Sequence, residues 1–332
     1  MITVSIICPI YNEERFIDNC IQSVLHQDIP SDRWELLLVD GFSTDTTRQH
    51  IQPYIEQYTN IRLLDNPHHT VPYAMNIGIH AAQGQYICRM DVHASFPSNY
   101  VSTLLRYINE LPDAANVGCT CNTMPVNDSA KAHAIAIACS HPLGVGNSTF
   151  RTATVRSPKR VGTVPFGFWS KNLFDQVGLF DEELTRNQDD EFNARTIQSG
   201  KHIYLVPNTC ITYYTRDKIR KIRRMFYQYG LFKPLVNHKL KHPATIRQFV
   251  PLLFIIELII GFPLSFVHPV LCGIYITTIL SYVLCIGIAG IHYRNAYLPL
   301  VFATMHFSYG WGYICGIGKV LFREPINAKT NR

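Results

Sequence analysis

Two stretches decide the fold, Trp34-Glu35-Leu36-Leu37-Leu38-Val39-Asp40-Gly41 and Tyr86-Ile87-Cys88-Arg89-Met90-Asp91-Val92-His93. Each begins with an apolar run of strand length and reaches an aspartate at the end of that run. In an open α/β sheet, the carboxyl ends of parallel strands border the crevice where ligands bind. We therefore expect Asp40 and Asp91 to point into one ligand-binding cleft.

The segments around these two runs alternate between strand and helix periodicity. Strands are predicted at residues 4–9, 34–39, 61–64, 86–90 and 164–170, and helices at residues 16–25, 73–82, 99–110, 171–177 and 189–199. This alternation predicts an α/β fold with a mostly parallel, doubly wound, Rossmann-like sheet. Asn12 is predicted to cap the first helix, and Thr44 or Asp45 the next. Residues 141–147 are predicted to form a loop.

A third acidic motif, Asn187-Gln188-Asp189-Asp190-Glu191, opens the last of these helices. The helix dipole favours acids at this end, which offers a purely structural explanation. Three acids in succession exceed what capping needs, so we favour acid–base chemistry at Asp189. The hypothesis is that Asp40, Asp91 and Asp189 gather around a single diphosphate cleft.

The 332-residue chain has a net charge of +6, too small to indicate a nucleic-acid partner. Charged residues are rare from Phe249 to Phe322, where residues 249–267, 271–291 and 297–317 are three apolar stretches of about membrane-spanning length. The basic run Arg216–Arg224 precedes them, which favours anionic membrane lipid and a cytoplasmic position. The ten cysteines are scattered, which is typical of reduced thiols in a cytosolic setting.

The membrane topology stays open at this point. Three full crossings would export the basic tail that contains Lys319 and Arg323, against the positive-inside tendency. One stretch is therefore re-entrant, or lies in the interface, or the lipid contact is shallower than hydropathy suggests. Glu257, inside the first stretch, is expected to face protein or a cavity. The expected organisation is a catalytic domain at residues 1–235, a basic juxtamembrane linker at 236–248, membrane-associated helices at 249–322 and a polar tail at 323–332.

Five motifs follow one another in a specific order. They are Pro9-Ile10-Tyr11-Asn12-Glu13, Val39-Asp40-Gly41-x-Ser43-Thr44-Asp45, Asn76-Ile77-Gly78, Asp91-x-His93 and Gln188-Asp189-Asp190-Glu191. Over residues 1–235 this combination resembles the family-2 inverting glycosyltransferases of GT-A fold. It is most similar to bacterial exopolysaccharide enzymes of the succinoglycan-pathway type, which carry an apolar C-terminal region.

The resemblance implies a role for each motif. Pro9, Tyr11 and Glu13 would line the nucleotide pocket, and Asp40 would bind the uracil or the ribose. Asp91 would be the metal-binding aspartate of a DxD-like motif, with His93 where many relatives have a second aspartate, and the metal would be Mn²⁺ or Mg²⁺. The family's Glu-Asp pair is Gln188-Asp189 here, so Asp189 would be the catalytic base, and Asp190 is the second choice.

The implied function is transfer of a sugar from a UDP-sugar, UDP-glucose being one candidate, to a lipid-linked or oligosaccharide acceptor at the cytoplasmic membrane. The Gln-x-x-Arg-Trp motif of processive synthases is absent, because Tyr229-Gly230-Leu231-Phe232 follows Gln228. Two alternatives remain: transfer to polyprenyl phosphate itself, and a catalytically silent nucleotide-sugar-binding subunit of a membrane complex. Residues 141–147 and 164–167 are expected on the acceptor side, where Phe166, Phe168 and Trp169 would either stack on a sugar or pack in the core.

Overall fold

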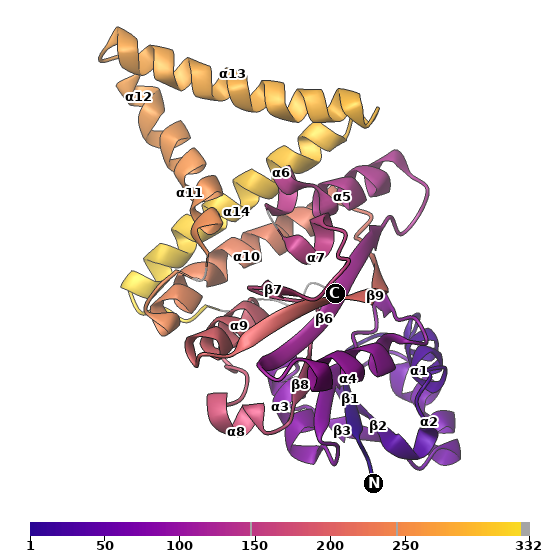
Figure 1. Cartoon of the computed structure of the whole chain (residues 1–332). Helices are drawn as coiled ribbons and strands as arrows, with labels where there is room; N and C mark the ends of the chain where they lie inside the picture. Colours follow the sequence, from indigo (N-terminus) through magenta and orange to yellow (C-terminus); the bar gives the residue numbers. More distant parts are fainter. Residues whose placement is uncertain (147, 244, 327–332) are drawn as a thin grey trace. The chain divides into compact units, whose positions relative to one another are not determined.

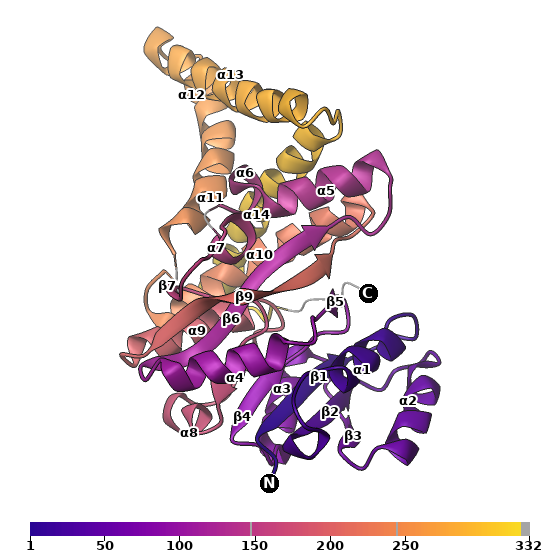
Figure 2. The same cartoon turned by 45° about the vertical axis from the view of Figure 1, so that its right-hand side comes forward.

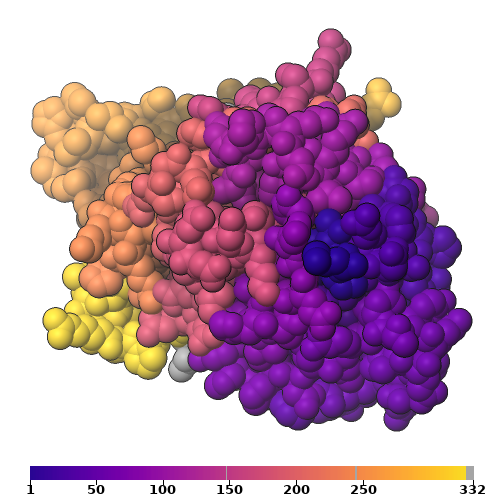
Figure 3. Space-filling view, turned by 60° about the horizontal axis from the view of Figure 1, so that its bottom comes forward, coloured from indigo at the N-terminus to yellow at the C-terminus, as the bar shows by residue number. Residues whose placement is uncertain are grey.

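The computed structural model describes residues 1–146, 148–243 and 245–326, and these form two compact units. Unit 1 comprises residues 1–122 and 149–213 and contains the sheet; unit 2 comprises the described parts of 123–148 and 214–326 and is helical. Figures 1 and 2 show the elements of both. Met1 is exposed, and Figure 3 shows the N-terminus at the surface of unit 1.

The first half of unit 1 is the predicted parallel sheet. It contains β1 (Val4–Ile10), β2 (Trp34–Asp40), β3 (Ile61–Asp65) and β4 (Tyr86–Arg89), in the order β3-β2-β1-β4. The register pairs Ile10 with Asp40, and Asp40 with Asp65. Every residue of β1 and β2 is buried, as expected for parallel strands covered on both faces.

Antiparallel strands extend the sheet beyond β4. They are β8 (Phe168–Ser170), β6 (Ala114–Met124), β9 (His202–Tyr214) and β5 (Ala94–Ser95), with β7 (Lys159–Val161) paired to β9. The prediction did not include β5, β6, β7 or β9, and the predicted strand at 164–170 is reduced to β8. Unit 1 therefore has a mixed sheet whose parallel half was predicted.

Helices cover both faces of the sheet. They are α1 (Ile17–Leu25), α2 (Thr47–Gln57), α3 (Val71–Ala81), α4 (Tyr100–Glu110), α7 (Thr149–Thr152), α8 (Leu173–Val177) and α9 (Gln188–Gln198). Alternate residues of β2 belong to different cores: Leu36 and Leu38 pack with α1 and α4, whereas Leu37 packs with α3 and α9. Phe168 and Trp169 are buried in these cores, so core packing, not sugar stacking, explains them.

Unit 2 consists of helices. They are α5 (Ala130–Ser140), α6 (Pro142–Val145), α10 (Ile219–Leu240), the 3-10 turn η2 (Ile246–Gln248), α11 (Phe249–Ile256), the π-helical η3 (Glu257–Gly261), α12 (Phe262–Leu264), α13 (Pro269–His292) and α14 (Leu298–Leu321). The loop predicted at 141–147 is wrong, because α6 occupies most of it and Asn147 lies outside the described residues. The predicted domain end at 235 falls inside α10, so the compact units do not coincide with the predicted domains.

Two helical segments are long and apolar enough to span a membrane. They are Ile246–Leu264, with 17% of its most apolar window buried, and Pro269–His292, with 6% buried. The third predicted stretch, 297–317, forms α14, which packs against α10 and α5. The described chain therefore offers two candidate spans instead of the three apolar stretches predicted. Oε1 of Glu257 is buried, as expected for an acid within such a segment.

Glycines allow α10 and α14 to approach closely. A Cβ at Gly312 would collide with the carbonyl oxygen of Tyr227, one at Gly230 with that of Tyr309, and one at Gly316 with that of Leu231. These collisions involve backbone of the facing helix, which a side-chain rotation cannot relieve. The crossing therefore depends on hydrogen as the side chain at each position.

We predict that Gly312→Ala destabilises the protein by about 1–3 kcal/mol, because the added methyl overpacks this crossing. Gly318→Ala is the matched control on the same helix, since a Cβ at Gly318 meets nothing within 4 Å. It should be neutral or slightly stabilising, because alanine favours helix over glycine by about 1 kcal/mol. Denaturant unfolding in detergent micelles measures both. Equal stability of the two variants would contradict the close crossing.

Candidate functional site

The loop after β1 is tied to the loop after β2 by direct hydrogen bonds. The amide of Asn12 donates to Oγ of Ser43 (2.8 Å), the amide of Thr44 donates to Oδ1 of Asn12 (2.8 Å), and the amide of Glu13 donates to Oγ1 of Thr47 (2.7 Å). Asn12 has φ +56°, a left-handed conformation that asparagine tolerates. The predicted cap at Asn12 is therefore wrong, because its side chain braces the two loops and α1 begins later, at Ile17.

Asp40 lies at the end of β2, as predicted, with a fully buried side chain. Its carboxylate accepts from Oγ of Ser43 (2.5 Å) and pairs with Nε of Arg48 (2.5 Å), whose Nη2 reaches Asp65 (2.5 Å). The carboxylate thus holds the β2–α2 loop and Arg48 in place. Its contact with a nucleotide stays a prediction. Arg48 was missed from sequence, although it is a cation in the first turn of the helix that follows Asp40.

Aromatic rings surround Gly41, the residue after Asp40. Nδ1 of His69 lies 2.5 Å from the carbonyl oxygen of Gly41, and the His69 ring centroid is 6.0 Å from that of Tyr11 and 6.1 Å from that of Phe42. Phe42 is exposed. These three rings form a surface suited to stacking a base. Tyr11 was predicted here, but His69 and Phe42 were not.

A buried arginine joins the second and third acidic motifs. The side chain of Arg89, only 6% exposed, makes a bidentate contact with Asp91: Nε to Oδ1 (2.7 Å) and Nη2 to Oδ2 (2.8 Å). Its Nη1 lies 2.8 Å from Oδ1 of Asp189, 100 positions further along the chain. Asp91 and Asp189 therefore share one cation, and the predicted juxtaposition of these two acids is present. Arg89 itself was missed, although a charge inside an apolar strand is unusual.

Two further contacts hold α9 where Asp189 can reach Arg89. Asn76, from the third motif, donates through Nδ2 to the carbonyl of Phe180 (2.9 Å) and accepts from the Phe180 amide (3.0 Å), which fixes the segment before α9. Glu191 pairs with Arg195 (2.7 Å), and Arg195 donates to the carbonyls of Val177 and Leu179. Glu191 therefore has a structural role within the acidic motif.

The environment of Asp189 changes its acidity. Burial raises the pKa of its carboxyl, Arg89 lowers it, and the neighbouring carboxylates of Asp91 and Asp190 raise it again, so the net shift is upward. The side chain is still 40% exposed, so the desolvation is partial and the carboxylate remains open to a substrate. A carboxylate with a raised pKa is a better proton acceptor than an ordinary aspartate.

Glu13 and His93, predicted for nucleotide and metal respectively, face each other. Nε2 of His93 lies 3.1 Å from Oε1 of Glu13, whose side chain is almost completely buried, and the ring of Phe16 packs 5.1 Å from that of His93. The pair links the β1–α1 loop to the loop that carries Asp91. Pro9 is buried within β1, next to Val39 of β2.

The residues around Asp91 fit a divalent cation only together with a substrate. Within residues 1–146, 148–243 and 245–326, no group of three or more His, Cys, Asp and Glu side chains could hold a metal ion. Mg²⁺ is, however, commonly held by one or two carboxylates and completed by phosphate oxygens and water. Asp91, whose side chain is 30% exposed, is the carboxylate that could serve in this way.

Comparison with known proteins identifies the family. The model of "Glycosyl transferase family 2" matches residues 5–168. A curated protein of Methanococcus voltae, named dolichyl N-acetyl-alpha-D-glucosaminyl phosphate 3-beta-D-2,3-diacetamido-2,3-dideoxy-beta-D-glucuronosyltransferase, is 33% identical over 243 residues, covering 71% of this chain and 74% of that protein. The chain belongs to glycosyltransferase family 2.

Two further likenesses extend over nearly the whole glycosyltransferase. Succinoglycan biosynthesis protein ExoA of Rhizobium meliloti (strain 1021) is 26% identical over 330 residues, 93% of each chain. The mannosyltransferase PcManGT from Pyrobaculum calidifontis, solved in complex with GDP-Man and Mn²⁺, shares the fold with a TM-score of 0.56 at 16% identity, over 96% of this chain and 87% of that one. The expected family and the GT-A fold are both confirmed.

Proposed function

We propose that this glycosyltransferase is a metal-dependent, inverting hexosyltransferase. It moves a sugar from a UDP-sugar, UDP-glucose being one candidate, to a lipid-linked saccharide in exopolysaccharide or cell-surface glycan synthesis. The observation that carries the proposal is the shared contact of Asp91 and Asp189 with Arg89. The names of the M. voltae and R. meliloti relatives support a lipid-linked acceptor and a polysaccharide pathway.

Asp189 is proposed as the general base. A sugar hydroxyl is too weakly acidic to attack unaided at neutral pH, and a carboxylate within hydrogen-bond reach accepts its proton as the new bond forms. Attack from the face opposite the leaving diphosphate inverts the anomeric centre, and no covalent intermediate is needed. Arg89 acts as a positioning residue that holds Asp189 toward Asp91. Asp190 is the second candidate for the base.

The donor is proposed to lie across the ends of β1, β2 and β4. Tyr11, Phe42 and His69 would offer ring surfaces to the nucleobase. Asp40 and Glu13 would be the acids that accept hydrogen bonds from the uracil or the ribose, and Pro9 would line the same pocket at the end of β1. Asp91, with His93 after a change of its contact to Glu13, would hold Mn²⁺ or Mg²⁺. When bound, such a cation neutralises charge that develops on the leaving diphosphate. The solved mannosyltransferase of the same fold was obtained with Mn²⁺, which supports this choice.

The two apolar segments are proposed to form a membrane hairpin with both ends in the cytoplasm. Between Glu257 and Arg294 the sequence has no Asp, Glu, Lys or Arg, whereas Arg247 lies at the start of the first span and Arg294 follows the second. Tyr297 follows the end of the second span, and its ring centroid lies 5.3 Å from the ammonium of Lys131 on α5. Basic and aromatic residues at this end are typical of a membrane–water interface.

Helix α14 is proposed to lie along that interface. One of its faces is buried against α10 and α5, and its opposite face exposes Leu300, Phe307 and Trp311. Two crossings return the tail to the cytoplasm, so Lys319 and Arg323 obey the positive-inside tendency that three crossings would violate. Unit 1 would accordingly work at the cytoplasmic face.

We predict that Asp189→Asn abolishes sugar transfer while donor affinity changes little, because the amide cannot accept the proton. In the wild type, the rate should fall as the pH is lowered through the raised pKa of Asp189, since only the carboxylate form is a base. UDP release by membranes that contain lipid-linked saccharide or polyprenyl phosphate measures transfer and separates the two acceptor classes. Asp175→Asn, on the exposed face of α8, is the matched control. Full turnover in Asp189→Asn would exclude this base.

Mn²⁺ affinity should rise about tenfold or more in the presence of UDP, because the protein alone supplies too few ligands and coupling between bound ligands is reciprocal. Titration of the full chain with Mn²⁺, with and without UDP, measures this effect. Asp91→Asn should remove the coupling, and EDTA should stop transfer until Mn²⁺ or Mg²⁺ is added back. Undiminished transfer in EDTA would remove the metal from the proposal.

A single cysteine placed at Val267→Cys should react with a membrane-impermeant maleimide applied to intact cells. One placed at Glu324→Cys should react only after permeabilisation, with the native cysteines replaced in both backgrounds. This pattern follows from an even number of crossings. External labelling at 324, or protection at 267 until permeabilisation, would contradict the hairpin.

A further inference from the structure

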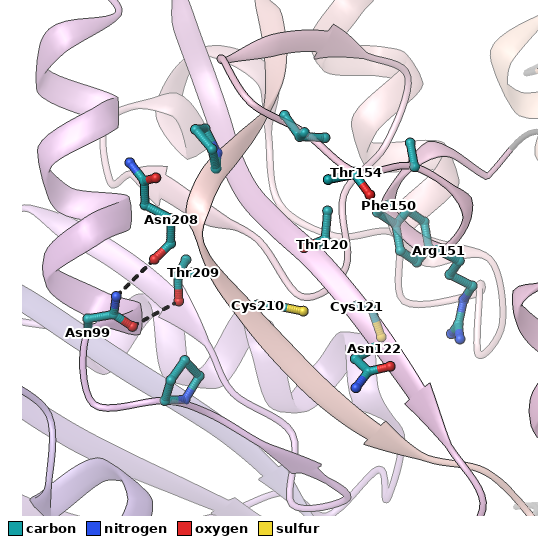
Figure 4. Close-up of a pocket in the computed structure, with 14 residues that line it drawn as sticks. Asn99, Thr120, Cys121, Asn122, Phe150, Arg151, Thr154, Asn208, Thr209 and Cys210 are labelled. Carbon is teal, nitrogen blue, oxygen red and sulfur yellow. Dashed lines mark hydrogen bonds between the residues drawn. The ribbon is translucent and has the colours of Figure 1, made fainter.

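Unit 1 contains a groove that the proposed donor site does not use. It has a volume of about 670 Å³ and lies between β6, β9 and the segment of residues 150–155 (Figure 4). None of the acids at 40, 91 and 189 lines it. Its lining instead combines amides, hydroxyls and an aromatic ring, among them Asn122, Thr120, Thr154 and Phe150.

A break in the alternation of β9 shapes the floor of this groove. Side chains of a regular strand alternate between its two faces. Val206 and Ile211 nevertheless both pack in the core that contains α1 and α4, although an odd number of positions separates them. Between them, Asn208 has φ +72°, the geometry of an extra residue inserted in a strand, and its Nδ2 donates to the hydroxyl of Tyr107 (3.0 Å). Such insertions re-aim side chains and are frequent beside active sites. Here the insertion leaves Cys210 exposed in the groove while Thr209 is buried.

One rim of the groove is already satisfied by internal hydrogen bonds. Asn99 donates through Nδ2 to the carbonyl of Asn208 (2.9 Å) and accepts from the hydroxyl of Thr209 (3.2 Å), as Figure 4 shows. These two bonds connect Asn99 to β9 and leave its amide with less capacity for an external ligand.

On the facing side of the groove, the side chains of Thr120, Asn122 and Thr154 make no hydrogen bond within the described chain. Thr120 and Asn122 are two positions apart on β6, so they share one face of the sheet, and Thr154 lies on the opposing segment. Asn122 and Thr154 are exposed and Thr120 is half-buried. Together they offer two hydroxyls and one amide, which supply both donors and acceptors.

An apolar surface adjoins these groups. The ring of Phe150 is half-buried, and the guanidinium of Arg151 lies 5.3 Å from its centroid and 5.2 Å from that of Tyr213. A sugar ring presents an apolar C–H face and a rim of hydroxyls that donate and accept. Aromatic surface beside a few uncommitted hydroxyl and amide groups is the complement of that shape.

A chain of side-chain contacts links the groove to the acid cluster. Val164 packs in a small core with Ile203 and Leu205, against which Phe150 also packs. Two positions later, the ring of Phe166 lies 6.0 Å from the guanidinium carbon of Arg89. The segment 164–167 therefore contacts Arg89 through Phe166 and is linked to Phe150 of the groove through this small core. The subsite proposed below requires that a saccharide whose reacting end reaches Asp189 extends past this segment into the groove.

We propose that this groove is a saccharide subsite that binds sugar units of the acceptor beyond the unit that reacts. The proposal rests on the proposed function, because it assumes that Asp189 marks the reacting end. It assigns acceptor length recognition to Thr120, Asn122 and Thr154, and the stacking surface to Phe150.

The test combines glycan-array binding with kinetics of the full chain in detergent micelles. We expect the wild type to bind oligosaccharides on the array, and Asn122→Ala and Thr154→Trp to weaken that binding about tenfold. Asn122→Ala removes one or two hydrogen bonds, and Thr154→Trp fills part of the groove with a bulky side chain. Asn19→Ala, an exposed amide on α1, is the matched control and should bind as the wild type does. In transfer assays the same two variants should raise KM for long acceptors about tenfold, with kcat and the KM for the donor unchanged.

The outcomes separate the groove from the catalytic proposal. Asp189→Asn should keep array binding while losing transfer. Loss of transfer with retained binding would therefore support both the saccharide subsite and Asp189 as the general base. Array binding that is absent in the wild type, or unaffected by Asn122→Ala and Thr154→Trp, would overturn the subsite whatever the transfer assay shows. Equal increases of KM for short and long acceptors would overturn it as well, because a distal subsite acts only on long ones.

Discussion

The ion pairs of Arg89 with Asp91 and Asp189 are the constraint on which the site depends. A guanidinium buried in the sheet is costly unless carboxylates compensate its charge, and leaving it unpaired would destabilise the fold by several kcal/mol. The chain must therefore bring the start of α9 to the end of β4. Arginine suits this position better than lysine, because its planar fork contacts one carboxylate in a bidentate manner while the remaining nitrogen reaches a second.

The same ion pairs hold together the two carboxylates that are proposed to take part in the reaction. Two carboxylates so close together would repel each other, and the cation between them allows both to lie at one site. In the proposed reaction, a nucleoside diphosphate and a divalent cation would bring further charge of both signs to that site. The proposed nucleotide pocket is held by other contacts, because the loops after β1 and β2 are braced by Asn12 and anchored by the pair of Asp40 and Arg48.

Sequence predicted the parts of the fold that depend on local pattern. The parallel strands β1 to β4 and their helices follow from apolar runs and helical spacing, and the acids at their ends follow from the geometry of parallel sheets. The antiparallel strands β6 and β9 were not predicted, since their pairing joins distant segments with little local signature.

Asn12 was misassigned because an asparagine before acids fits a helix cap as well as a brace between loops. Arg89 was passed over as part of a strand, although its charge was the signal. In the tail, the apolar run at 297–317 suggested a third span, but α14 is less apolar over its length than the two candidate spans. Glycines such as Gly312 pack it against α10 instead, a contact that the apolar run alone does not indicate.

The most direct measurement of the central claim is a crystal structure of the full chain with a UDP-sugar and Mn²⁺. We predict that the diphosphate lies beside Asp91 and that the nucleobase lies among the rings of Tyr11, Phe42 and His69. We also predict that the carboxylate of Asp189 faces the anomeric carbon from the side opposite the diphosphate. A donor bound elsewhere, or one whose anomeric carbon faces away from Asp189, would contradict this claim.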